Sequence, residues 1–242
     1  MRPSQRTPAH RKGILAAYHG SMSMTTRPAL TLDFVSDVSC PWCAIGLSAL
    51  QQAIAQVGGD IDIVLQCQPF ELNPQMPPGG QDIDEHLAQK YGSTPEQQAQ
   101  VRDTIRQRGA EVGFAFNTQG RGRIYNTFKA HRLLHWAGIE QPQAQVALKM
   151  ALLQACHTER QAMDQPEALL GAVRAARLDL DRAQAVLDSD LFAEEVREAE
   201  AFYTGQGVRA VPAVVINGRH LVSGGQPVEV YVQALRQVAA AG

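Results

Sequence analysis

The sequence has few cysteines, few aromatic residues, almost no net charge and no long hydrophobic run. Cysteine occupies only positions 40, 43, 67 and 156, and the first two lie too close together to join distant elements, which argues against a secreted disulfide framework. The formal net charge of −2 argues against nucleic acid or an anionic membrane as a partner. No apolar stretch approaches the roughly 20 residues that span a bilayer. The hydrophobic share of 45% nevertheless supports a substantial core.

The pattern of the first 28 residues does not predict a secretory signal. Their only apolar run, residues 14–18, is shorter than the roughly 7 to 15 residues of a signal-peptide core, and no convincing cleavage site follows it. We therefore expect a cytoplasmic protein that does not bind membranes, and we interpret residues 1–28 as a disordered extension. Met1, Met22 and Met24 are alternative start positions, because the latter two stand just before the first predicted strand.

The densest internal basic patch lies between residues 123 and 132. It comprises Arg123, Lys129, His131 and Arg132. Exposed helices commonly carry such charges, so we interpret this patch as a solvated helix face rather than a nucleic-acid site.

The first part of the chain after this leader alternates between strand and helix patterns. Residues 30–35 form an apolar, β-prone run that predicts a buried strand. Residues 40–57 follow a helical spacing that ends at Gly58-Gly59, and residues 61–68 alternate as in a second strand. The unit strand, helix, strand is therefore predicted over about 40 residues.

The middle of the chain, residues 69–197, is rich in Ala, Gln, Glu and Arg with a helical period. Thr94 and Pro95 predict a helix start, with a stop near Gly113. Further helices are predicted to begin at Pro166 and after Asp190. Another helix has one apolar face, made of Ala144, Ala147, Leu148, Ala151, Leu152 and Ala155, and Cys156 beside it is interpreted as a core residue.

The strand pattern returns near the C-terminus. Residues 213–216 and 220–223 flank the turn signal Asn217-Gly218, which predicts a hairpin, and a final helix is predicted from 227 to 240. This order predicts an α/β, thioredoxin-like fold with a large all-helical insertion. We expect the thioredoxin-like domain to comprise residues 29–70 and 199–242, with the insertion at 71–198.

The strongest chemical signal is the motif Cys40-Pro41-Trp42-Cys43. It follows a predicted strand and opens a predicted helix, so Cys40 is expected at the N-cap, with Pro41 at the first helical position, where a missing N–H costs nothing. The helix N-terminus stabilises a thiolate at Cys40, and Cys43 lies one turn inside the helix. We therefore predict that Cys40 attacks a disulfide and that Cys43 resolves the mixed disulfide.

Two other interpretations of this motif were weighed. A zinc site needs two further ligands with compact spacing, and neither Cys67, Cys156 nor the scattered histidines offer a second pair, so no metal is expected. A coincidental pair without chemistry is disfavoured by the strand and helix context.

A second candidate element is Val211-Pro212, directly before a predicted strand. One interpretation is an ordinary proline at a strand entry. The other is a cis-proline opposite Cys40, which would leave the Val211 backbone free to pair with an extended substrate. These residues alone leave both interpretations open.

Five segments in order resemble the FrnE-like branch of the DsbA oxidoreductase family. They are DFVSDVSCPWC at 33–43, QPFELNP at 68–74, NTFKAHR at 126–132, GVRAVP at 207–212 and SGGQP at 223–227. The resemblance covers about residues 30 to 240. It implies a thioredoxin domain with a helical insertion, a redox pair at Cys40 and Cys43, and a cis-proline at Pro212.

The resemblance also implies where a substrate binds and what accompanies the reaction. Pro41, Trp42, Val211 and Pro212 are the expected substrate-binding residues. The redox-active disulfide needs no other cofactor, glutathione is a candidate reductant, and the partners are thiol or disulfide proteins or glutathione, with a monomer or homodimer both open. Related folds place a buried carboxylate near the pair. Asp33 and Asp37 are the nearby candidates, and we expect Asp37 to be a surface residue.

The expected enzyme is a thiol–disulfide oxidoreductase of the protein disulfide oxidoreductase or isomerase class. One alternative is a glutathione-dependent transferase or isomerase of the kappa or 2-hydroxychromene-2-carboxylate isomerase type, acting on a small aromatic substrate. Serine typically replaces the first cysteine in that group, so Cys40 and Cys43 argue against it. A third hypothesis is a peptide-binding or chaperone module without catalysis. The direction of electron flow is left open.

Overall fold

The computed structural model describes residues 27–241 of the chain. The expected disordered extension therefore lies almost entirely outside the described residues. Within 27–241, none of the helices is both long and apolar enough to cross a lipid bilayer.

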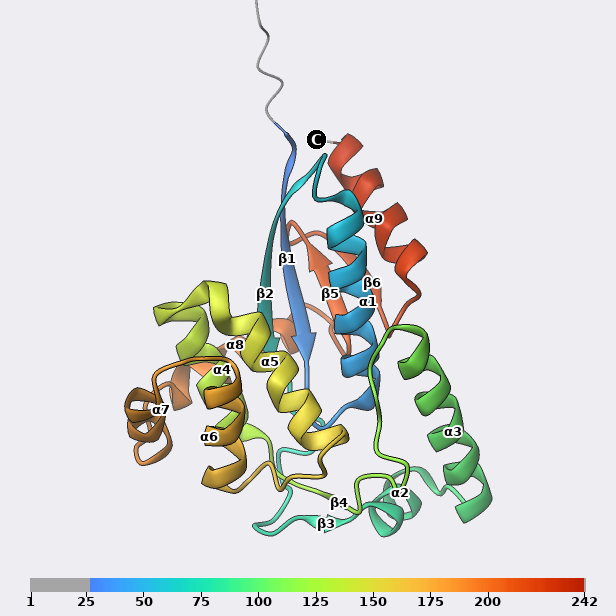
Figure 1. The fold of residues 1–242 in the computed structure, drawn as a ribbon, viewed down its shortest axis with the longest axis vertical. Helices are drawn as coiled ribbons and strands as arrows, with labels where there is room; N and C mark the ends of the chain where they lie inside the picture. The colour runs from blue at the N-terminus through green and yellow to red at the C-terminus, as the bar shows by residue number, and fades with distance from the viewer. Residues whose placement is uncertain (1–26, 242) are drawn as a thin grey trace, which may run out of the picture.

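A four-stranded mixed sheet forms the centre of the molecule (Figure 1). Strands β1 (Ala29–Ser36) and β2 (Asp62–Pro69) are parallel, whereas β5 (Ala213–Ile216) is antiparallel to both β1 and β6 (His220–Ser223). The order in the sheet is β2-β1-β5-β6, so the first and last parts of the chain meet in one sheet. The predicted strands and the hairpin turn are confirmed.

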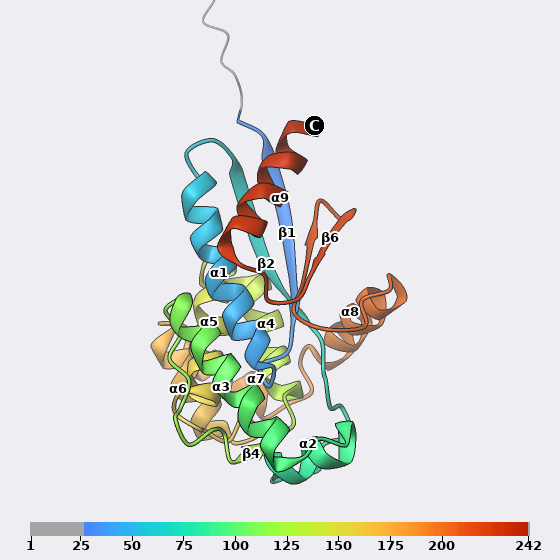
Figure 2. The same cartoon turned by 90° about the vertical axis from the view of Figure 1, so that its right-hand side faces the viewer.

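Helices α1 (Pro41–Val57) and α9 (Val228–Ala241) pack side by side on one face of this sheet (Figure 2). The alternation of β1 directs Leu30, Leu32 and Phe34 into this layer, where they pack with Leu47 of α1 and Tyr231 of α9. The cysteine pair lies in the same core. The opposite face of the sheet carries a smaller cluster around Val35, Tyr203 and Val208, beneath the end of α8.

Residues between β2 and β5 form a second, mainly helical core. Its helices are α2 (Ile83–Tyr91), α3 (Pro95–Glu111), α4 (Phe128–Glu140), α5 (Pro142–His157), α6 (Pro166–Ala175), α7 (Leu180–Leu187) and α8 (Ala193–Gly205). Trp136, Leu148 and Leu152 are fully buried at its centre. The chain is thus a thioredoxin-like α/β fold with a large helical insertion. The insertion also contains one short strand pair, β3 (Gln81–Asp82) with β4 (Arg123–Ile124).

The helix starts follow the expected local chemistry. The Thr94 hydroxyl accepts from the N–H of Gln97, whose side chain bonds back to the N–H of Thr94, so α3 begins with a complete capping box. The apolar face predicted for α5 is correct only in part, because Ala147 is exposed and the buried face centres on Gln145, Leu148, Lys149 and Leu152. The alanine side chain is small and is a poor indicator of a buried face. The prediction from the alanine positions therefore gave the wrong centre for the buried face of α5.

The interpretation of the basic patch as a solvated helix face is wrong for two of its members. His131 and Arg132 are buried on α4, because this helix packs against β2 on one side and against α5, α7 and α8 on the others. The guanidinium of Arg132 donates to the backbone carbonyls of Val186, Ser189 and Leu191, which end α7 and precede α8. Arg132 therefore joins elements of the insertion.

Candidate redox site

Cys40 is the N-cap of α1, with Pro41 opening the helix. Its backbone is extended, at φ −89° and ψ 115°, and its N–H donates to the carbonyl of Asp37 at 3.2 Å. The Cys43 N–H donates to the Cys40 carbonyl at 3.1 Å, which closes the first turn of the motif. The first turn of α1 carries no acidic side chain that would oppose a thiolate. Strand β1 and helix α1 thus place both thiols at one end of the sheet.

The two thiols differ in their acidity. A hydrogen bond from the Cys43 thiol lowers the pKa of Cys40; burial acts against it, and the backbone N–H groups of Cys43 and Trp42 lower it further. Burial raises the pKa of Cys43 well above its ordinary value, and the neighbouring Cys40 adds to this effect. The arrangement therefore favours a thiolate at Cys40 and a protonated thiol at Cys43.

Val211 and Pro212 face the pair from the start of β5. The Val211–Pro212 peptide bond is cis, and the Cys40 Sγ lies 3.6 Å from the Val211 carbonyl oxygen. Pro41, Trp42 and Val211 are half-buried, whereas Pro212 is buried. The structure therefore brings together the six residues predicted from the sequence, although Cys40 and Val211 are separated by 171 positions in the chain.

Helix α1 approaches this loop very closely. A Cβ at Gly46 would lie 3.0 Å from Cγ of Pro212, and one at Gly225 would lie 3.0 Å from the Trp42 carbonyl oxygen. Two glycines without side chains thus allow the helix, the Pro212 loop and the segment before α9 to meet behind Cys40.

The expectation that Asp37 is a surface residue is wrong. Its side chain is 1% exposed, and its carboxylate accepts from the N–H of Ser39 at 2.9 Å, the N–H of Leu72 at 2.7 Å and the hydroxyl of Thr127 at 2.9 Å. Burial alone would raise the pKa of Asp37, but His131 and these backbone donors hold it well below its ordinary value. Asp37 is a buried anion that fixes the loop before Cys40.

Asp33, the other carboxylate considered, lies on the wrong face of the sheet to reach Cys43. Alternation along β1 directs it with Val35 away from α1, and it accepts from the Gln68 amide at 2.8 Å.

Three basic side chains of the insertion bind the backbone carbonyls of the loop that leads to Cys40. Lys149 donates to the carbonyl of Ser36 at 3.4 Å, and the imidazole Nε2–H of His157 donates to that of Val38 at 2.9 Å. Arg121 donates to the carbonyl of Ser39. None of these three contacts was predicted from the sequence. One available signal was the charge of Lys149 between Leu148 and Leu152, two apolar residues of α5.

The remaining two cysteines are buried away from solvent. Burial raises the pKa of Cys67 to about 11, and burial also raises the pKa of Cys156. Both favour the protonated thiol, so the low-pKa cysteine among the four free thiols is Cys40. Among residues 27–241, no three side chains of the metal-binding types cluster closely enough to hold a metal ion.

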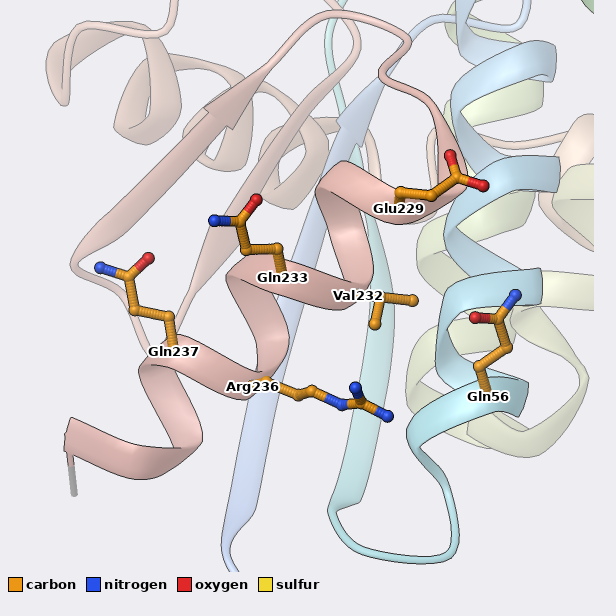
Figure 3. Close-up of a pocket in the computed structure, with 6 residues that line it drawn as sticks. All are labelled: Gln56, Glu229, Val232, Gln233, Arg236 and Gln237. Atoms are coloured by element: carbon orange, nitrogen blue, oxygen red, sulfur yellow. The ribbon is translucent and has the colours of Figure 1, made fainter.

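A surface groove lies away from the redox pair. It has a volume of about 590 Å³ and runs between Gln56, at the far end of α1 from Cys40, and polar residues of α9 (Figure 3). Its lining residues are Gln56, Glu229, Val232, Gln233, Arg236 and Gln237. No cysteine or histidine is among them, so the groove offers no group for thiol exchange, and that chemistry belongs to the other end of α1.

A central sheet with a Cys-x-x-Cys pair at the first helix and a cis-proline opposite defines the thioredoxin class of proteins. The model of the DSBA-like thioredoxin domain matches residues 31–236, and the chain belongs to this family. No curated protein matches the chain in sequence. Among solved structures, a probable DsbA oxidoreductase from Streptomyces coelicolor is 31% identical, with a TM-score of 0.78; the match covers 88% of this chain and 90% of that one.

Two more distant structures share the fold. A 2-hydroxychromene-2-carboxylate isomerase is 16% identical with a TM-score of 0.63, covering 86% of this chain and 95% of that chain. A cytosolic disulfide reductase, DsbM from Pseudomonas aeruginosa with GSH, is 15% identical with a TM-score of 0.59, covering 86% and 98%. At these identities the likeness concerns the fold alone.

Proposed function

We propose that the protein is a thiol–disulfide oxidoreductase in which Cys40 is the attacking and Cys43 the resolving cysteine. The observation that carries this proposal is the geometry of the pair: Cys40 is the N-cap of α1, Cys43 lies one turn inside the helix, and the Val211 carbonyl oxygen lies 3.6 Å from Cys40 Sγ. The lowered pKa of Cys40 and the raised pKa of Cys43 agree with these roles. A thiolate is the nucleophile in disulfide exchange, and a partner thiol one turn away can close a small disulfide ring with little backbone movement.

In the oxidising direction for the protein, the Cys40 thiolate attacks one sulfur of a substrate disulfide. A Cys40–substrate disulfide forms, the substrate S–S bond breaks, and one substrate thiolate leaves and takes up a proton. Cys43 then loses its proton and attacks Cys40 Sγ, so the Cys40–Cys43 disulfide forms and the second substrate thiol is released. The substrate has gained the two electrons that the pair has lost. The reverse sequence oxidises a substrate dithiol, and the reduction potential decides between the two directions.

The proposed substrates are extended cysteine-containing peptides of proteins or glutathione. Val211 lies just before the paired register of β5, and its carbonyl already accepts from the Cys40 thiol, so a cysteinyl backbone beside it would bring its sulfur close to Cys40. Pro41 and Trp42 would form the other side of this site. We further propose a cytoplasmic protein of the FrnE-like branch, monomeric or homodimeric, with no cofactor beyond its disulfide and glutathione as reductant.

Trapping of the mixed disulfide tests this proposal. Reduced wild-type, Cys40→Ser and Cys43→Ser proteins are incubated with glutathione disulfide, quenched in acid and analysed by mass spectrometry. Cys43→Ser should accumulate one glutathione on Cys40, wild type should convert to the Cys40–Cys43 disulfide, and Cys40→Ser should acquire neither.

A Cys156→Ser variant is the matched control. Burial raises the pKa of this thiol and it lies outside the Cys-x-x-Cys pair, so its replacement should leave both reactions unchanged. Full disulfide-exchange activity in Cys40→Ser would overturn the proposal. Conjugation of glutathione to a small aromatic compound that survives Cys43→Ser would indicate the transferase or isomerase reaction instead.

A further inference from the structure

The side chain of Lys149 is fully buried near the redox pair, and the exchange reaction described above assigns it no role. Its side chain is 0% exposed on α5, and its Nζ makes one long hydrogen bond, 3.4 Å to the carbonyl of Ser36. Among the described residues, no carboxylate forms a salt bridge with Lys149 within 4.0 Å. Burial of an ammonium without a counter-ion costs free energy of folding. A functional role of Lys149 would explain why a lysine occupies this buried position.

Helix α5 carries Lys149 to the interface between the two cores. Met150 and Leu153 pack into the core that contains the cysteine pair, whereas Leu148 and Leu152 pack into the core of the insertion. The Ser36 carbonyl that Lys149 binds ends β1, four residues before Cys40. The side chain is therefore held beneath the loop that leads to the redox motif.

The charge of Lys149 acts on thiols from three elements. Burial raises the pKa values of Cys43 on α1, Cys67 on β2 and Cys156 on α5, and Lys149 lowers all three. The charged and titratable groups around Lys149 and Cys43 are Asp37, Cys40, Cys67, Arg121, Cys156, His157 and Tyr231. Of these thiols, Cys43 is the one that must ionise during exchange.

No carboxylate among the nearby candidates is placed to take the proton of Cys43. Both carboxylate oxygens of Asp37 accept hydrogen bonds from Ser39, Leu72 and Thr127, and its low pKa makes it a poor base. Asp33 lies on the other face of the sheet. The resolving thiol therefore lacks a carboxylate partner, and a fixed positive charge is the available means of stabilising its thiolate.

Building on the proposed exchange reaction, we propose that Lys149 is a positioning residue for its second half, in which the buried ammonium stabilises the thiolate of Cys43. In the resolving direction, Cys43 releases its proton to water, attacks Cys40 Sγ and displaces the substrate thiolate, which takes up a proton. In reverse, an external thiolate attacks Cys40 Sγ, and Cys43 leaves with the electron pair of the broken bond.

Stopped-flow kinetics with the neutral disulfide 4,4′-dithiodipyridine separates the two halves of the reaction. Attack by Cys40 releases a first equivalent of thiopyridone, and resolution by Cys43 releases a second. In Lys149→Met, which keeps the side-chain length, the first phase should match wild type. The second should be about tenfold slower at pH 7, and its pH profile should move upward by about one unit, because one nearby charge is lost.

Leu153→Met is the matched control, since it alters buried packing one turn along α5 without altering charge. It should leave the second phase within about twofold of wild type, because such hydrophobic exchanges are tolerated. An unchanged second phase and pH profile in Lys149→Met, or equal slowing in Leu153→Met, would overturn the inference while leaving the proposed function intact. Absence of the first phase in wild type would instead contradict the proposed function itself.

Discussion

The two cysteines of the motif differ in thiol pKa although they lie only three residues apart. Cys40 precedes the helix and meets the backbone N–H groups of Trp42 and Cys43, whereas Cys43 is inside the helix and 0% exposed. Their hydrogen bond strengthens the difference, because it stabilises the thiolate of Cys40 and the thiol of Cys43. The division of labour between attack and resolution therefore arises at the level of single residues.

Asp37 is expected to contribute to stability rather than to proton transfer. Asp37→Asn should reduce the free energy of unfolding by about 2 to 4 kcal/mol at pH 7, because an amide cannot replace a carboxylate that accepts three hydrogen bonds. The folded-state pKa of Asp37 is lower than its unfolded value of about 4, so its stabilisation is complete above pH 4 and is lost as the pH falls below it. The difference in the free energy of unfolding between Asp37→Asn and wild type should therefore become smaller below pH 4.

Urea unfolding at pH 7, 5 and 3.5 measures this dependence. Asp164→Asn is the control, since this half-buried carboxylate also accepts from a backbone N–H, that of Gly79, and its replacement should cost less than about 1 kcal/mol. Equal losses of unfolding free energy in Asp37→Asn and Asp164→Asn would contradict the role assigned to Asp37. A difference between Asp37→Asn and wild type that does not change with pH would also contradict it.

At the scale of the elements, the close packing of α1 against the Pro212 loop depends on Gly46, which has no side chain. Gly46→Ala should lower the free energy of unfolding by about 1 to 2 kcal/mol, because contacts with Cγ of Pro212 at 3.0 Å and the Tyr231 hydroxyl at 3.4 Å outweigh the gain in helix propensity. It should also slow disulfide exchange, since Pro212 must shift beside Cys40. Thermal unfolding and the thiopyridone assay measure the two effects.

Gly171→Ala supplies the comparison within α6. A Cβ at Gly171 has no neighbour within 4 Å, so the substitution should stabilise the protein by about 0.5 to 1 kcal/mol and leave exchange unchanged. If Gly46→Ala proved as stable and as active as Gly171→Ala, the close approach of α1 to Pro212 would not matter in solution.

The sequence predicts those parts of the fold that depend on local patterns. The strand before Cys40, the capping of α3 by Thr94 and the hairpin at Asn217-Gly218 each follow from neighbouring residues. Burial of Asp37 depends instead on Leu72 and Thr127, which are brought to it by distant elements. Lys149 was missed for the same reason, because its significance comes from the end of β1 and from Cys43 rather than from α5.

At the scale of the whole molecule, the insertion completes the site rather than merely extending the domain. Arg121, Lys149 and His157 reach from three places in the insertion to backbone carbonyls between the end of β1 and Cys40. The sheet supplies the thiols and Pro212, and the helical core fixes their position and charge environment. Both cores therefore contribute to one redox centre.

A redox titration of the full chain tests the central claim most directly. Protein equilibrated in glutathione buffers of graded ratio is alkylated with a mass-shifting reagent, and the free thiols are assigned by peptide mass spectrometry. Cys40 and Cys43 should lose their free thiols together in one two-electron step. Cys67 and Cys156 should remain thiols throughout, because burial raises the pKa of each and neither belongs to a Cys-x-x-Cys pair. Free thiols at both Cys40 and Cys43 in every buffer, including the most oxidising, would contradict the account.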